Sequence, residues 1–302
     1  MTKRRFFRFV AGAGLFVACA GWLCRGADRW MIPGVLYYAT PWLLRLTAGL
    51  VALAAFRHWR LRAVAGTCAF VSLLEGARSF RFDDLKVRAD APVVAVWNAG
   101  RDLQGKPAAW PELALTDLCA VIECGKHFNE EGWREFIAAT PDHEWKRFDG
   151  STMLGVRGRI LSHESLGVHD RFRCHRVRVA LPDHGEFTVV VADIRSQPWI
   201  SREQAMAGIL RAAGDDPRAI ILGDFNTPPE SVWFREWRTR GFTLANDGPR
   251  RGFRETWAHG LPLLTLDHVW LAPGWRPLRC DRLRLGSDHL AVKVVLSPAA
   301  RD

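Results

Sequence analysis

Three apolar stretches in the first 78 residues limit what this chain can fold into. Each carries at most one charged residue: Phe9–Cys24, Pro41–Phe56 and Leu61–Leu74. The first is long enough, with the phenylalanines before it, to cross a bilayer as a helix. Tryptophan side chains stand at the edges of the stretches, as they do at membrane interfaces. We therefore expect residues 1–78 to form a membrane anchor of two or three transmembrane helices.

The charges of this segment predict how the anchor is oriented. It holds eleven Lys and Arg residues against Asp28 and Glu75, so it carries +9 of the net charge of +10 and the other residues carry +1. The cations cluster before the first stretch and between the second and third, which places both clusters in the cytoplasm. Three crossings then put the C-terminal domain outside the cytoplasmic membrane. A third stretch lying in the membrane interface would leave that domain in the cytoplasm.

Other interpretations of these stretches stay open. The first resembles a cleaved signal peptide ending near Ala18 and Ala20, and Cys19 allows a lipoprotein. The second and third stretches are also compatible with buried helices of a soluble domain. The basic clusters and the edge tryptophans favour an integral, multi-pass membrane protein over these readings.

The pattern changes after a linker over residues 79–90, and residues 91–302 alternate short apolar runs with amphipathic segments. The runs typical of strands are Val93–Trp97, Leu118–Ile122, Met153–Val156, Val177–Leu181, Phe187–Val191, Ala219–Leu222, His268–Leu271 and Ala291–Leu296. The expected helices are Glu130–Ala139, Arg202–Ala213 and Ser231–Arg240. Several strands follow one another without a helix between them. This order predicts mixed sheets with helices outside, in the α/β class.

Polar residues follow many of these strands. They are Asn98, Glu123, the run Gly223–Asn226, the pair Asp267 and His268, and the run Ser287–His289. Carboxylates at the ends of neighbouring strands are well placed to hold a hard cation. Each signal alone is modest, because Asp and Asn also occur in ordinary turns.

Taken in order, these residues resemble the endonuclease/exonuclease/phosphatase superfamily over roughly residues 90–298. The strongest parts of the resemblance are Gly223–Asn226, followed by Thr-Pro-Pro, and Ser287–His289, followed by Leu-Ala-Val. The resemblance implies a four-layer α/β sandwich, in which two mixed sheets pack face to face and helices cover them. It also implies a hydrolase that cleaves phosphoester bonds with a divalent metal, Mg²⁺ or Mn²⁺.

The resemblance implies a role for each of the polar residues. Glu123 would bind the metal, Asp288 would lie near it and Asn98 would lie beside Glu123. Asp224 would orient or deprotonate the attacking water. A carboxylate oxygen is the ligand that a hard cation prefers, which agrees with the role of Glu123.

The remaining matched residues concern the phosphate. Asn226 would contact it through its amide, whose NH₂ group can donate to a phosphoryl oxygen. Asp267 would pair with His289, and the protonated imidazole would stabilise charge on the transferred phosphoryl group. Many family members have a phosphate-binding His where this chain has Asp193. An ionised Asp cannot donate a hydrogen bond, so Asp193 would bind a second metal, or Arg195 would take over the phosphate.

These residues predict a membrane-anchored, metal-dependent phosphohydrolase that cleaves a phosphoester or pyrophosphate bond. An anchor favours a lipid-linked substrate, because it raises the effective concentration of membrane substrates. An extracytoplasmic endonuclease acting on DNA is the alternative, although a domain charge of +1 gives little attraction for nucleic acid. A non-catalytic binding module is the rival from another class, and Asp193 motivates it. No protein partner can be inferred from the sequence.

Overall fold

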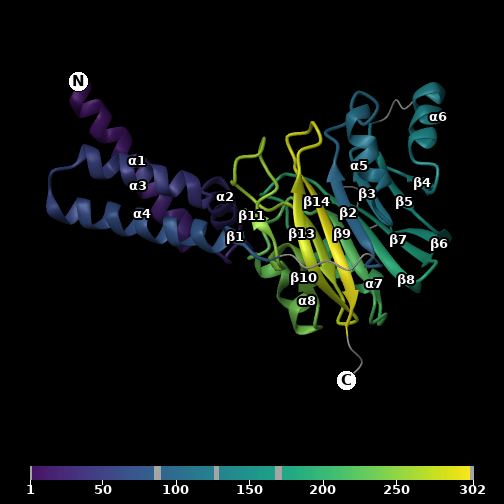
Figure 1. The fold of residues 1–302 in the computed structure, drawn as a ribbon. Coiled ribbons are helices and arrows are strands. Elements are labelled where there is room, and N and C mark those ends of the chain that lie inside the picture. The colour runs from purple at the N-terminus through teal and green to yellow at the C-terminus, as the bar shows by residue number, and fades with distance from the viewer. Residues whose placement is uncertain (1, 85–89, 126–128, 167–171, 300–302) are drawn as a thin grey trace.

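A computed structural model describes residues 2–84, 90–125, 129–166 and 172–299 of the protein. Figure 1 shows two parts, an N-terminal bundle of helices and a larger sandwich of two sheets. Part of the expected linker, residues 85–89, lies outside the described residues. The segment before it is structured, because β1 (Arg81–Phe82) pairs with β11 (Arg251–Gly252) of the sandwich.

The bundle consists of α1 (Lys3–Leu23), α2 (Met31–Ala39), α3 (Trp42–Ala55) and α4 (Trp59–Ser79). The backbones of α3 and α4 approach closely at Gly49, where a Cβ atom would lie 2.8 Å from the Ala69 nitrogen. Arg8 donates a hydrogen bond from Nε to the Ala55 carbonyl at 3.3 Å. The start of α1 therefore lies beside the turn between α3 and α4, at the end of the bundle away from the sandwich (Figure 1).

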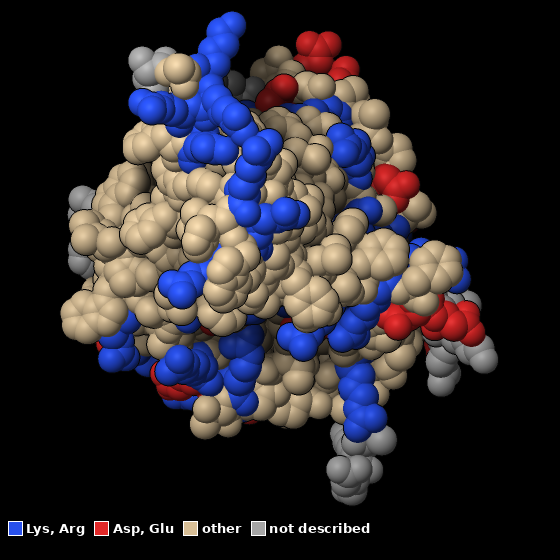
Figure 2. Space-filling model, turned by 90° about the vertical axis from the view of Figure 1, so that its left-hand side faces the viewer, with Lys and Arg blue, Asp and Glu red and all other residues tan. Residues whose placement is uncertain are grey.

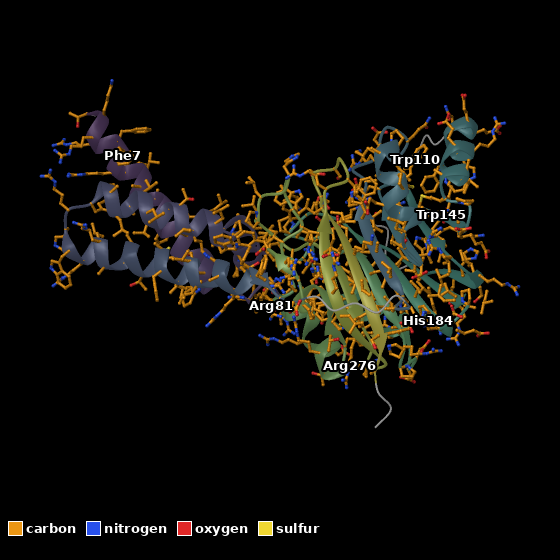
Figure 3. All side chains as sticks on the ribbon, viewed as in Figure 1. Phe7, Arg81, Trp110, Trp145, His184 and Arg276 are labelled. Atoms are coloured by element: carbon orange, nitrogen blue, oxygen red, sulfur yellow. The ribbon has the colours of Figure 1, made fainter. Side chains whose placement is uncertain are left out.

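The bundle exposes large apolar side chains on each long helix. Phe16 of α1 is 74% exposed, Leu50 of α3 is 54% exposed and Phe70 of α4 is 61% exposed. Phe7 likewise projects from α1 near the free end of the bundle (Figure 3). Viewed from that end, the surface is largely uncharged, and blue Lys and Arg side chains predominate over red acidic ones (Figure 2). Such a surface is unusual for a part of a protein that faces only water.

Length and hydropathy support fewer membrane crossings than the sequence analysis expected. Among the described helices, only α1 is long and apolar enough to cross a membrane alone. The pair α2 and α3, bent by 74° at the break between them, passes the same test together. The third expected stretch belongs to α4, which does not pass, because it also carries Arg60, Arg62, Glu75 and Arg78.

The sandwich contains two six-stranded sheets. The first has the order β13 (Trp275–Leu283), β14 (Ala291–Pro298), β2 (Val93–Asn98), β3 (Leu118–Ile122), β5 (Thr152–Val156), β4 (Glu144–Phe148). The second has the order β10 (Thr243–Leu244), β12 (Asp267–Leu271), β9 (Ile220–Asp224), β8 (Gly185–Ile194), β7 (Phe172–Leu181), β6 (Arg159–Leu166). Both sheets are mixed, since β2 pairs with β3 and β8 with β9 in parallel while their other pairs are antiparallel.

Alternate residues of the strands fill the space between the sheets with buried aliphatic side chains, including Val96, Val191 and Leu222. The outer faces are covered by helices. The 3₁₀ turn Pro107–Ala109, α5 (Trp110–Ala114) and α6 (Glu130–Ala139) cover the first sheet, where Trp110 and Trp145 pack (Figure 3). The second is covered by α7 (Glu203–Ala213), the 3₁₀ turn Val232–Phe234 and α8 (Arg235–Thr239). A further 3₁₀ turn is Ala245–Asp247. The expected four-layer α/β sandwich is confirmed.

Strand pairing brings the polar strand ends to one edge of the sandwich. In the first sheet, Asn98 is the register partner of Ile122, the residue before Glu123. In the second sheet, Asp224 has Asp193 as its parallel partner and Asp267 as its antiparallel partner. Residues far apart in the sequence therefore face the same region.

Candidate active site

A cleft of about 830 Å³ lies at this edge, between the ends of the two sheets. Eight of the residues selected from the sequence line it: Asn98, Glu123, Asp193, Arg195, Asp224, Asn226, Asp288 and His289. The ninth, Asp267, lies behind His289 and is fully buried. The structure thus gathers all nine residues around one cleft.

Asp224 ends β9 and is held from both sheets. Its Oδ2 accepts a hydrogen bond from Asn98 Nδ2 of the other sheet at 2.8 Å, and its Oδ1 accepts one from the Asn226 N–H at 2.9 Å. Burial raises the pKa of this carboxyl, and the nearby carboxylates of Asp267 and Asp193 raise it further. A cation in the cleft would act in the opposite direction and favour the carboxylate.

Asn226 sits in a tight turn behind Asp224. Its φ of +45° is in the left-handed region that Asn tolerates better than most residues. Its Nδ2 donates a hydrogen bond to the Ile194 carbonyl at 2.7 Å, which ties this turn to the end of β8. One amide hydrogen is used in this way, and the NH₂ group retains a second one for the cleft.

His289 and Asp267 form a buried pair across the two sheets. His289 Nδ1 lies 2.8 Å from Asp267 Oδ2. Burial alone would lower the pKa of His289, but the carboxylates of Asp267, Asp224 and Asp288 outweigh it and raise the pKa to about 10. The imidazole is therefore protonated at neutral pH. With Nδ1 bonded to Asp267, Nε2 is the ring nitrogen that can donate to a ligand.

The carboxylates on the other side of the cleft fit a hard divalent cation. Glu123 has a φ of +50° directly after β3, and one of its oxygens accepts from Arg101 Nε at 3.2 Å. Burial raises the pKa of Asp193 to about 6, and the charge of Glu123 contributes to this shift. Repulsion between two carboxylates is relieved when a cation lies between them, and oxygen is the donor atom that Mg²⁺ and Mn²⁺ prefer.

A second arrangement of possible ligands needs separate consideration. Ligand atoms of Asp224, Asp267 and His289 lie within 4.8 Å of one another. His289 and Asp267 already bond to each other, however, and a protonated imidazole cannot bind a metal. The other oxygen of Asp267, Oδ1, has no hydrogen-bond partner among the described residues. The side of the cleft near Glu123 and Asp193 therefore fits a cation better.

The structure also adds cleft residues that sequence reasoning missed. Arg101 and Arg173 line the cleft, and Trp257 donates a hydrogen bond from Nε1 to Asp288 Oδ2 at 3.1 Å. Tyr38 also lines the cleft. It belongs to α2 and precedes β2, the first strand of the two sheets, by more than fifty residues. The alternation of polar residues in β7 was the only local signal for Arg173. No local signal points to Tyr38 or Trp257, because tertiary contacts alone bring them here.

Asp193 lies where a phosphate-binding His was expected from the resemblance. It is the antiparallel partner of Arg173 in the register of β7 and β8, and Arg195 follows two residues later. Both arginines line the cleft with Asp193. The cleft therefore has donors for phosphate oxygens close to the carboxylate that cannot provide one.

Comparisons with known proteins agree with the fold of the sandwich. The sequence profile of the Endonuclease/Exonuclease/phosphatase family matches residues 97–289. No curated protein sequence matches the chain. Among solved structures, an AP endonuclease from Archaeoglobus fulgidus is similar with 11% identity and a TM-score of 0.52, over 68% of this chain and 99% of that one. The 3′ phosphatase NExo from Neisseria, solved with a product DNA hairpin, has 15% identity and a TM-score of 0.50, over 68% of this chain and 100% of that one.

The His289–Asp267 pair leads to a prediction about pH. Because the folded pKa of His289 is raised above its ordinary value of 6.5, the pair stabilises the fold fully below pH 6.5, and this contribution is lost as the pH rises through about 10. We expect Asp267→Asn to lower the pKa of His289 by roughly 1 to 3 and to weaken this pH dependence. An NMR titration of the metal-free protein measures the pKa, with His289→Gln to identify the signal. Asp215→Asn removes an exposed carboxylate and serves as control; an unchanged His289 pKa in Asp267→Asn would contradict the assigned pairing.

Proposed function

We propose that this chain, which belongs to the endonuclease/exonuclease/phosphatase family, is a membrane-anchored phosphohydrolase that depends on a divalent metal. Members of this family are hydrolases that act on phosphoester bonds. The observation that carries the proposal is the arrangement of the cleft. A protonated His289 held by Asp267 and a buried Asp224 held by Asn98 line the same cleft as the carboxylates of Glu123 and Asp193.

The charges of the cleft support hydrolysis of a phosphate ester with Mg²⁺ or Mn²⁺. Without a cation, the carboxylates of Glu123, Asp193, Asp224 and Asp288 would repel a phosphate, despite the arginines that line the same cleft. A divalent cation bound by Glu123, with Asp193 or Asp288 near it, would neutralise negative charge on the phosphoryl group. The donor set therefore suits a metal cofactor better than metal-free catalysis.

Other residues of the cleft would act on the attacking water and on the phosphate. Asp224 accepts hydrogen bonds on both carboxylate oxygens and is held in one orientation, in which it can orient or deprotonate the attacking water. His289 donates from Nε2 to a phosphoryl oxygen and stabilises the charge that develops in the transition state. Asn226 and Arg195 supply further donors to the phosphate from the turns after β9 and β8.

The bundle supports the proposal of a membrane anchor. Its exposed apolar side chains would contact lipid, and α1 would cross the membrane with the pair α2–α3 and the helix α4 packed beside it. The basic residues at the start of α1 and around the turn between α3 and α4 lie at the same end. They would face the cytoplasm, so the sandwich at the opposite end would lie outside the cytoplasmic membrane.

We favour a lipid-linked phosphate or pyrophosphate as substrate. Tyr38 belongs to α2 of the bundle and lines the cleft, so the proposed anchor forms part of the cleft wall. A phosphate group at the membrane surface could then reach Glu123 and His289 without leaving its lipid. The second candidate is an endonuclease acting on DNA, which Arg101, Arg173 and Arg195 in the cleft favour.

The first test concerns the catalytic residues. We expect Asp224→Asn to lower the metal-dependent hydrolysis of bis(p-nitrophenyl) phosphate by about 100-fold or more, since the amide cannot act as a base. The melting temperature shows whether the fold is retained, and Asp215→Asn is the matched control on the surface. Full activity of Asp224→Asn would refute its role.

A calorimetric titration that detects neither Mg²⁺ nor Mn²⁺ binding would favour the non-catalytic rival.

The second test separates the two substrate classes. We expect phosphate release from a long-chain lipid phosphate in mixed micelles to exceed plasmid nicking by at least about tenfold in kcat/KM, because the anchor and the substrate share one surface. Both reactions are measured with the full-length protein in the same detergent and with the same metal. Faster nicking of DNA, lost with Asp224→Asn, would support the endonuclease instead.

The third test concerns the anchor and its orientation. We expect the full-length protein to stay in the membrane pellet after extraction with alkaline carbonate. Protease added to intact spheroplasts should digest the sandwich, because the proposed orientation places it outside. Release by carbonate would contradict the anchor, and digestion only after the cells are lysed would contradict the orientation.

A further inference from the structure

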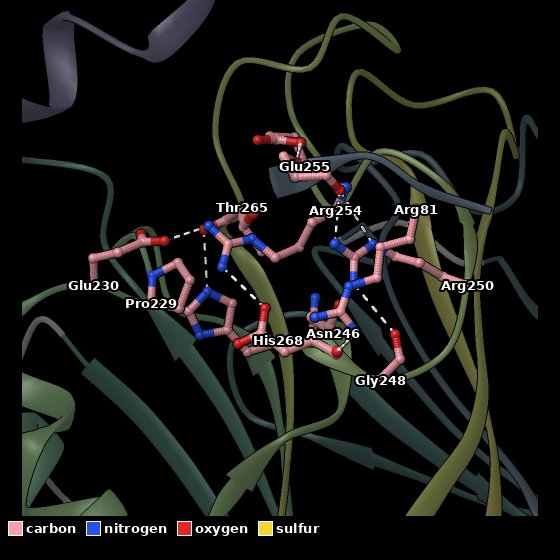
Figure 4. Close-up of polar contacts among 12 residues, drawn as sticks. Arg81, Pro229, Glu230, Asn246, Gly248, Arg250, Arg254, Glu255, Thr265 and His268 are labelled. Carbon is pink, nitrogen blue, oxygen red and sulfur yellow. Dashed lines mark hydrogen bonds and ion pairs between the residues drawn. The ribbon is translucent and has the colours of Figure 1, made fainter. Parts of the chain in front are cut away.

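The bundle and the sandwich meet at a dense polar junction. Arg254 of the sandwich pairs with Glu230, and Arg250 donates hydrogen bonds to the carbonyls of Gly248 and of Ser79 at the end of α4 (Figure 4). From the bundle, Trp42 Nε1 donates to Glu255 Oε1 at 3.2 Å, and Tyr37 donates to Glu230 Oε2 at 3.3 Å. These contacts fix where the bundle sits against the sandwich.

A second set of contacts at this junction leads toward the cleft. Asp28, in the turn between α1 and α2, is 8% exposed. Its Oδ2 accepts hydrogen bonds from the hydroxyls of Tyr38, at 2.7 Å, and Ser231, and its Oδ1 accepts one from the Val232 N–H at 3.1 Å. The phenol of Tyr38 is therefore held in place from the sandwich as well as from the bundle.

The ring of Tyr38 covers a buried arginine. The guanidinium carbon of Arg202 lies 5.6 Å from the centre of this ring, within the range of a cation–π interaction. Arg202 is only 2% exposed, and burial lowers its pKa, while Tyr38 and the carboxylate of Asp28 act against this shift. Partners that the bundle supplies thus offset part of the cost of burying the Arg202 charge.

Arg202 in turn holds the loops that carry cleft residues. Its Nη2 donates to the carbonyls of Arg195, at 3.3 Å, and Asn226, at 3.0 Å. Its Nη1 donates to the carbonyls of Gln197, at 3.3 Å, and Ile200, at 3.1 Å. One guanidinium therefore joins the loop after β8 to the turn after β9, and both line the cleft.

We propose that Tyr38 and Asp28 of the bundle are positioning residues for the active site and act through Arg202. Tyr38 covers the guanidinium and Asp28 fixes the Tyr38 hydroxyl, so that Arg202 keeps the loop of residues 195–200 and the turn at Asn226 in one arrangement. The bundle is then a structural part of the catalytic site and not only a tether. This inference concerns the arrangement of the loops, and it rests on the proposed function only where hydrolysis is the readout.

Hydrogen exchange measured by mass spectrometry tests the inference on the full-length protein in detergent. We expect Tyr38→Ala to speed amide exchange in residues 195–202 and 225–227 by about tenfold, because the interactions that hold Arg202 are lost. Tyr38→Phe keeps the ring over Arg202 but loses the bond to Asp28, so its exchange should rise by about threefold, less than in Tyr38→Ala but above the wild type. Unchanged exchange in Tyr38→Ala would overturn the proposal.

Trp42→Ala is the matched control. It removes an aromatic side chain of the bundle and its hydrogen bond to Glu255 at the same junction, and Trp42 does not line the cleft. Tyr37 is unsuitable, because its ring centre lies 5.5 Å from that of Tyr38. We expect Trp42→Ala to leave exchange in the two segments unchanged. Equal loosening by Trp42→Ala would show that the effect is a general weakening of the junction and would refute a specific role for Tyr38.

Kinetics provide the functional readout. With bis(p-nitrophenyl) phosphate, we expect Tyr38→Ala to lower kcat by about tenfold or more and to change KM little, since small misplacement of catalytic groups is costly. Combining Tyr38→Ala with Arg202→Lys should give less than the sum of the two single effects, because one acts through the other. Additive effects would contradict the inference that Tyr38 acts through Arg202. A wild type without hydrolysis would refute the proposed function, while the exchange data would still decide this inference.

Discussion

Two hydrogen bonds that cross from one sheet to the other define the cleft. Asn98 of the first sheet donates to Asp224 of the second, and His289 beside β14 of the first pairs with Asp267 of β12 in the second. Each bond is buried, where an unpaired polar group would be costly. The two sheets must therefore keep a fixed register at this edge for both bonds to form. The packed aliphatic layer between the sheets provides that register.

The sequence predicted the parts of the sandwich that have a strong local signal. Buried strands such as β3 were placed at their observed bounds, and the motifs at Gly223–Asn226 and Ser287–His289 pointed to residues that lie around one cleft. The edge strands β4 and β6 were missed because they carry mixed polar residues without a clear apolar pattern and have no fully buried residue. The strand β13, which mixes Arg, Pro and Asp, likewise has no clear apolar pattern and was missed.

The N-terminal quarter was predicted less completely, for a different physical reason. Composition and charge indicated helices in three places, and α1, α3 and α4 form there, but the short helix α2 was not expected. Its importance comes from contacts with residues such as Arg202, which is more than 160 positions away in the chain. Spacing within a sequence cannot reveal that kind of neighbour. The role of Trp257 beside Asp288 was hidden in the same way.

The polar junction between bundle and sandwich affects how the cleft would encounter a substrate in the membrane. A domain on a flexible tether samples many heights and orientations above a membrane. Here the bonds from the bundle to Glu230 and Glu255, and from the sandwich to Asp28, hold the sandwich in one position on the bundle. On the proposed anchor, the cleft would stay at a constant height relative to the membrane and would move only in the plane of the bilayer. Its rate would then follow the number of substrate molecules per unit area of bilayer, and dilution of the surrounding solution would leave that rate unchanged.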